Sequence, residues 1–178
     1  MNDTLKYILQ LETDSNFEAA LNEYRQLFRS NIEDLELWKF YYFFLWYISV
    51  EDIALGLENF NEENQINFDL LTLTKFGIEN YSNNPEALFV MGYTVSVYPY
   101  IFPELQNWED CGRSMLEKAS NLVPLDDIYK LAYLGSHSYN EPEYNALCKQ
   151  TTGQVKSRFR GNGLLNSYFI DVLDRASQ

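Results

Sequence analysis

The segment WKFYYFFLWY, residues 38–47, limits the possible folds more than any other stretch of this chain. Eight of its ten residues are aromatic, and Lys39 carries its only charge. The segment suits a membrane span, a ligand cage or a buried core helix. The uninterrupted apolar run covers only residues 40–48, whereas a membrane-spanning helix needs roughly 20 apolar residues. A helix that is apolar on all sides is buried on most of them. We therefore expect a central helix over 32–50 in which the mostly buried residues are Trp38, Phe40, Tyr41, Phe44 and Leu45.

Apolar residues recur every three or four positions along most of the chain, which is typical of amphipathic helices. Residues 51–67 are polar and acidic, and we expect a short helix and then a loop there. A chain of 178 residues is within the usual size of one domain. The sequence therefore predicts one all-α domain, residues 1–178, with about eight or nine helices. The longer helices are expected over residues 2–11, 14–30, 32–50, 68–80, 85–98, 108–123, 125–137, 141–153 and 164–176.

Residues 85–124 resemble a tetratricopeptide repeat, a pair of antiparallel helices. Pro85 and Ala87 precede the large, apolar and small positions of its first helix, which are Leu88, Met91 and Gly92. The small, large, alanine and proline positions of the second helix are matched by Gly112, Leu116, Ala119 and Pro124. The chain departs from the family by about eight additional residues between the two helices, in YPYIFPELQNW. The resemblance implies a helical bundle or short tetratricopeptide-like solenoid, a class of fold that typically binds proteins or peptides.

The charge of the chain is strongly negative and unevenly spread. Residues 1–147 carry 24 acidic and 8 basic side chains, whereas residues 148–178 carry 2 and 5. An acidic body repels a phosphate backbone, so we expect no direct binding to nucleic acid. It attracts a basic protein, although the same acidity also serves solubility alone. The basic stretch 149–160 either balances the acidic body, which we favour, or contacts nucleic acid or an acidic peptide.

No pattern in the sequence indicates a reaction. His137 is the only histidine, and the two cysteines, Cys111 and Cys148, match no zinc motif. A glycine-rich phosphate loop is absent from the sequence. The paired acids, such as Asp126-Asp127, fall in loops or first turns, where carboxylates are solvated or cap helices. We therefore expect a non-enzyme without metal or cofactor. The N-terminal sequence lacks the features of a signal peptide, and we expect a cytoplasmic protein that does not enter a membrane.

The connection Tyr-Pro-Tyr-Ile-Phe-Pro, residues 98–103, is too apolar for a plain loop. It either packs inward or forms a binding patch, because tyrosine-rich patches are typical of interface centres. In size, charge and composition the chain resembles the immunity proteins of bacterial polymorphic toxins, including those of contact-dependent growth inhibition. That resemblance implies a monomer that binds a basic toxin domain, often a nuclease, one to one. The expected contact residues are Glu58, Glu62, Glu63, Tyr98, Tyr100, Phe102, Glu104, Glu109 and Asp110.

The alternative is a tetratricopeptide-like adaptor or chaperone that holds an extended peptide in its groove. Such a groove usually presents Asn, Lys or Arg on its concave helices. Residues 40–48 offer mainly aromatic and aliphatic side chains instead. This difference favours the inhibitor.

Overall fold

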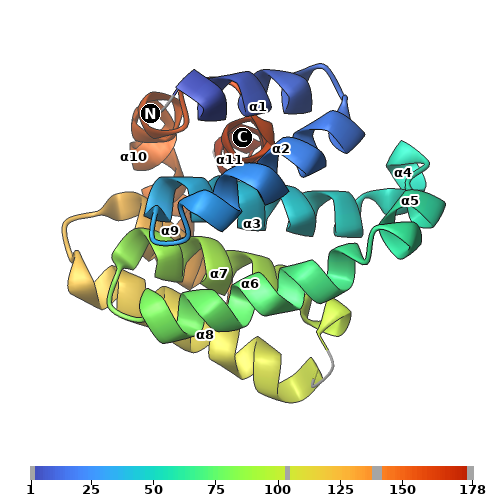
Figure 1. The fold of residues 1–178 in the computed structure, drawn as a ribbon. Coiled ribbons are helices and arrows are strands. Elements are labelled where there is room, and N and C mark those ends of the chain that lie inside the picture. Colours follow the sequence, from blue (N-terminus) through green and yellow to red (C-terminus); the bar gives the residue numbers. More distant parts are fainter. Residues whose placement is uncertain (1–2, 103–104, 138–141, 176–178) are drawn as a thin grey trace.

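The computed structural model describes residues 3–102, 105–137 and 142–175, and these residues form helices joined by short turns, without a strand among them. Nine of the described α-helices have seven or more residues, which confirms the predicted all-α fold of about eight or nine helices. The elements (Figure 1) are, in chain order, α1 (Asp3–Thr13), α2 (Phe17–Ser30), α3 (Leu35–Val50), α4 (Asp52–Leu55), α5 (Glu58–Glu63), α6 (Ile66–Asn80), α7 (Pro85–Val97), the 3-10 helix η1 (Pro99–Ile101), α8 (Leu105–Leu122), α9 (Asp127–Gly135), α10 (Pro142–Arg158) and α11 (Leu164–Arg175).

The aromatic segment forms the middle of α3 and is buried on all sides. The helix begins at Leu35, three residues later than expected, because the side chain of Asp34 accepts a hydrogen bond from the Leu37 N–H at 3.0 Å and caps it. Every residue from 40 to 46 is at most 6 % exposed, and Trp38 is fully buried. The prediction of a central core helix is confirmed.

Four helices enclose α3, and each packs against a different side of it. The Tyr24 ring of α2 stacks on that of Tyr41 at 5.0 Å, and the Trp38 Nε1–H donates to the Leu73 carbonyl of α6 at 3.1 Å. The Tyr42 hydroxyl is hydrogen-bonded to that of Thr94 in α7 at 2.6 Å, and the Phe43 ring lies 5.5 Å from that of Phe169 in α11. Because α3 touches helices from both halves of the sequence, the chain has one continuous core.

The pair α7 and α8 contains the residues on which the tetratricopeptide resemblance rests. A Cβ atom at Gly92 would lie 2.8 Å from the Gly112 carbonyl oxygen, and one at Gly112 would lie 2.8 Å from the Ser96 nitrogen. The two backbones are therefore in direct contact, and only glycine fits at either point. The small residues at these two positions are thus explained by the close packing of one helix pair.

Helices α3 and α7 run in the same direction and end on the same side of the molecule. Near their starts, Lys39 Nζ donates to Glu86 Oε1 at 2.5 Å, and near their ends the rings of Trp46 and Tyr98 are 6.2 Å apart. The short helix α5 is held at this end as well, because Asn61 Nδ2 donates to the Ile48 carbonyl at 2.6 Å. Figure 1 shows α5, η1 and the start of α8 on this side.

The last helix, α11, covers the face that α3 and α7 share. The Phe169 ring centroid lies 5.5 Å from that of Phe43, 4.8 Å from that of Phe89 and 4.9 Å from that of Phe159. Figure 1 shows α11 nearly end-on while α3 runs across the picture, so α11 crosses α3 instead of lying along it. The helix pairs therefore stack as in a solenoid, but the C-terminal helix closes the stack into a bundle.

Candidate functional site

The side of the molecule where α3 and α7 end, which we call the acidic end, has the features of an interaction surface. Between Lys39 and Arg113 the chain has one basic residue, Lys75, among eleven acidic ones. Most of these acids belong to the elements that meet at the acidic end. Four of the large apolar side chains that are exposed also belong to these elements, namely Ile53, Phe68, Val97 and Tyr100. Exposed apolar patches rimmed by polar groups mark sites of protein binding, and these four side chains are candidates for such a patch.

A group of four tyrosines, Tyr47, Tyr98, Tyr100 and Tyr168, forms the aromatic part of this surface, and we call it the tyrosine cluster. Tyr168 of α11 joins it to α3, because its ring centroid lies 6.2 Å from that of Tyr47 and 5.3 Å from that of Trp46. The Tyr98 ring lies 6.2 Å from that of Trp46 and 4.8 Å from that of Tyr100. The cluster thus rests on a fully buried tryptophan and is held by three elements.

The connection after α7 packs inward and also presents a residue outward. Pro99 starts the 3-10 turn η1, after which Phe102 is only 3 % exposed and packs on Trp108 at 5.2 Å. Tyr100 is 61 % exposed, and its hydrogen bond with Tyr98 raises the pKa of Tyr100 to about 12. Of the three aromatic residues proposed here as contacts, Tyr98 and Tyr100 reach the surface. Phe102 supports the turn from inside, where a rigid partner does not reach it.

Two carboxylates that the sequence did not single out lie beside the tyrosine cluster. Burial raises the pKa of the Tyr47 hydroxyl, and the negative charges of Glu51 and Asp171 raise it further. Burial likewise raises the pKa of Tyr168, with the charge of Glu51 contributing. Among the described residues, no Lys or Arg forms an ion pair with Glu51 or Asp171. In the sequence, only their positions point to them: Glu51 directly follows the aromatic helix, and Asp171 lies three residues after Tyr168.

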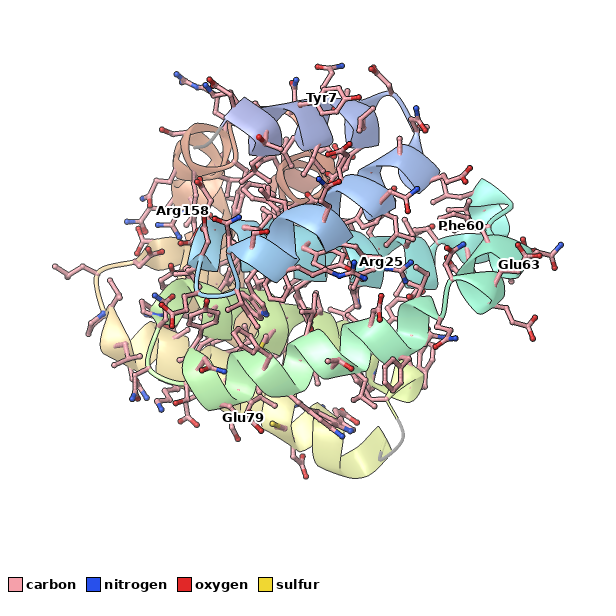
Figure 2. The ribbon with its side chains drawn as sticks, viewed as in Figure 1. Tyr7, Arg25, Phe60, Glu63, Glu79 and Arg158 are labelled. Carbon is pink, nitrogen blue, oxygen red and sulfur yellow. The ribbon has the colours of Figure 1, made fainter. Side chains whose placement is uncertain are left out.

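The expected acidic contacts occupy two further places at the acidic end. Glu58, Glu62 and Glu63 are exposed on α5, and Figure 2 shows Glu63 at the outer edge of the molecule. Asp110 is exposed in the first turns of α8, whereas Glu109 pairs with Arg113 one turn later. These side chains therefore lie at the same end as Tyr98 and Tyr100. Glu104 lies outside the described residues.

Several groups that carry charge elsewhere in the molecule are already paired. Arg25 donates to Asp69 at 2.7 Å and to the Asn64 carbonyl at 2.6 Å. In the basic stretch, Arg158 pairs with Asp126 and lies over the Tyr129 ring, 5.0 Å from its centroid. Arg158 thus offsets an acidic residue, in line with the interpretation favoured for this stretch.

Groups suited to catalysis are sparse in the described part of the chain. It holds no cluster of three or more His, Cys, Asp or Glu side chains able to bind a metal ion. Cys111 and Cys148 are both free, and burial raises the pKa of each thiol, so neither is an activated nucleophile. His137 is exposed, with its ring 4.6 Å from that of Tyr133. Within residues 3–102, 105–137 and 142–175, no helix has the length and apolar character that a membrane crossing requires.

Comparison with known proteins gives no relative for this arrangement. No family model, no curated protein and no solved structure matches the chain.

Proposed function

We propose that this protein is an inhibitor of the immunity type, which binds a basic toxin domain through the acidic end. The observation that carries the proposal is that exposed carboxylates and exposed apolar side chains lie together where α3 and α7 end. Carboxylates that face a basic cleft compete with the phosphate groups of its substrate, so a nuclease suits this surface. The exposed tyrosine and phenylalanine residues supply the apolar contact area of such an interface.

The packing of the core supports a rigid inhibitor. Three exposed elements of the acidic end are anchored to α3, by Asn61 for α5, by Tyr98 for η1 and by Tyr168 for α11. A surface that is already ordered loses little conformational entropy when it binds, which favours high affinity. The proposal implies a monomer that acts in the cytoplasm in a one-to-one complex, without metal, cofactor or nucleic acid.

The peptide adaptor remains the alternative, and the position of α11 weighs against it. An adaptor of the tetratricopeptide type leaves the shared face of its first helices open for a peptide. Here Phe169 and its neighbours in α11 cover the shared face of α3 and α7. A peptide would have to displace a helix of the chain before it could bind there.

Co-expression tests the proposal directly. The protein encoded by the adjacent reading frame is produced with and without this chain, and growth and complex formation are measured. We expect restored growth and a one-to-one complex by light scattering. The double variant Glu62→Lys/Glu63→Lys should weaken both effects. The matched control Glu33→Lys/Glu79→Lys changes the net charge equally but lies away from α5, as Figure 2 shows for Glu79. A wild-type chain that neither binds nor protects contradicts the proposal.

A further inference from the structure

The tyrosine cluster contains rings whose positions are fixed by contacts with the core. The rings of Tyr47 and Tyr168 are 6.2 Å apart and nearly perpendicular, at 84°. Tyr168 also packs against Tyr93, whose ring lies 6.0 Å away and whose hydroxyl oxygen is 3.4 Å from that of Tyr168. Both Tyr47 and Tyr168 remain half-buried, so each keeps some contact with solvent. A partner can therefore touch both residues without a rearrangement of the core.

The charged groups next to these rings are two carboxylates that form no ion pair within the described chain. Glu51 caps the end of α3 four residues after Tyr47, and Asp171 follows Tyr168 by three residues in α11, so each carboxylate lies one helical turn from a ring of the cluster. The negative charges of both raise the pKa of Tyr47. An aromatic face attracts a cation above it, and a carboxylate binds a guanidinium through two parallel hydrogen bonds. The surface therefore combines the two interactions that an arginine side chain makes best.

We propose that Tyr47, Tyr168, Glu51 and Asp171 form the anchor site for an arginine side chain from a loop of the basic partner protein. The guanidinium plane lies against a tyrosine ring and donates hydrogen bonds to the carboxylates. Lysine fits less well, because its ammonium group is a compact charge that neither stacks on a ring nor forms the paired hydrogen bonds. This proposal rests on the proposed function and specifies which side chain of the basic partner binds here.

A hexa-arginine peptide is the probe that tests the site without the partner. Calorimetry measures its affinity for the wild-type chain, for Glu51→Gln/Asp171→Asn and for the control Glu33→Gln/Glu79→Gln, which removes the same charge away from the acidic end. We expect the first variant to lose about tenfold or more in affinity, and the control only a few-fold, because charge-assisted hydrogen bonds are lost only in the first. Chemical shifts of the Tyr47 and Tyr168 ring protons should move on binding. A hexa-lysine peptide should bind several-fold more weakly.

Several results overturn the anchor site, and they differ from those that overturn the inhibitor. Equal losses in the two variants, equal affinity for the two peptides, or no binding by the wild type shows that the cluster does not select arginine. If Glu51→Gln/Asp171→Asn still binds the toxin domain normally, the anchor is wrong but the inhibitor stands. If the wild type binds no toxin domain, the inhibitor is wrong, and the peptide data still decide the anchor. Thermal unfolding curves of both variants confirm that they are folded.

Discussion

The carboxyl group of Glu12 at the end of α1 accepts a hydrogen bond at 2.7 Å from the backbone N–H of Leu164, the first residue of α11. It also accepts one at 2.5 Å from the Tyr24 hydroxyl and is only 2 % exposed. Beside it, the Gly163 N–H donates to the Thr13 hydroxyl at 3.3 Å. The first N–H groups of a helix have no partner within it, and here α1 supplies partners from the opposite end of the sequence. Glu12 thus fixes the start of the helix that closes the fold.

The burial of Glu12 makes stability depend on pH. Burial raises the pKa of this carboxyl from 4.5 to about 7, although its bonds with Tyr24 and Leu164 favour the charged form. The folded protein therefore keeps a proton that the unfolded chain releases above pH 4.5. The contribution of Glu12 to stability is greatest below about pH 4.5, falls as the pH rises to about 7, and is constant above that. The difference is of the order of 3 kcal/mol.

The variant Glu12→Gln tests this prediction, because its amide cannot ionise. The amide oxygen accepts from Leu164 and the amide nitrogen donates to the Tyr24 oxygen, so both contacts persist. Urea titrations should show similar free energies of unfolding for the wild type and variant near pH 5. Near pH 8 the variant should be more stable by up to about 3 kcal/mol. Glu79→Gln, at an exposed position, is the control and should change neither value. A constant difference between pH 5 and 8 contradicts the assignment.

Gly163 allows α11 to start against α1. Its φ is +100°, and a Cβ atom there would lie 2.7 Å from Leu9 Cδ2 and 3.0 Å from Glu12 Oε2. Gly163→Ala should therefore destabilise the protein by at least about 1–3 kcal/mol, from backbone strain and steric overlap. The control is Gly153→Ala within α10, where a Cβ atom would meet nothing within 4 Å. That change should stabilise by up to about 1 kcal/mol, because alanine favours helix. Chemical denaturation measures both, and equal effects would refute the prediction.

Much of the fold follows from local patterns in the sequence. The aromatic segment is apolar on every side, and only a central helix satisfies that pattern. Gly92 and Gly112 mark the contact between α7 and α8 because close backbone packing needs small residues at both points. Helical periodicity shows which face of a helix is buried but does not show which helix covers it. The crossing of α11 over α3 and α7 therefore had no signal in the sequence.

The candidate site was predictable only where the polarity or charge of a segment is unusual for its place in the sequence. The apolar connection between two helices indicated Tyr98 and Tyr100 as contacts, and the run of acidic residues indicated those of α5. Glu51 and Asp171 are ordinary acids in sequence, and they matter because folding brings both to Tyr47. Glu12 resembles a surface residue at the end of an amphipathic helix. It is buried because Leu164, 152 positions later, packs against it.

The two buried tryptophans of α3 should differ in their response to truncation. Both are at most 1 % exposed, but Trp38 Nε1–H donates to the Leu73 carbonyl, whereas Trp46 Nε1–H has no acceptor in the described structure. Trp38→Phe and Trp46→Phe remove the same atoms from the core. The first also removes a hydrogen bond, so it should cost about 1 kcal/mol more. Guanidinium titrations followed by circular dichroism measure the difference, and a larger loss for Trp46→Phe is the contrary result.

The acidic end should act mainly on the rate at which a basic partner is found. Exposed charges are screened over about 8 Å at physiological salt, so attraction between the free proteins weakens as salt is added. The contacts that hold the complex together are desolvated and respond less. With the cognate toxin domain, the association rate should fall at least about tenfold from low to high salt. The dissociation rate should change much less.

Charge reversal separates specific placement of the acids from general acidity. Glu62→Lys/Glu63→Lys and Glu109→Lys/Asp110→Lys each reverse two charges at the acidic end. Both should slow association in surface-plasmon experiments, and the first should have the larger effect because Glu109 is already paired with Arg113. Glu33→Lys/Glu79→Lys should slow association least, since those residues lie away from α5. If all three variants behave alike, the partner senses only the net charge of the protein. If salt leaves the association rate unchanged, the acidity serves solubility and the partner binds through other contacts.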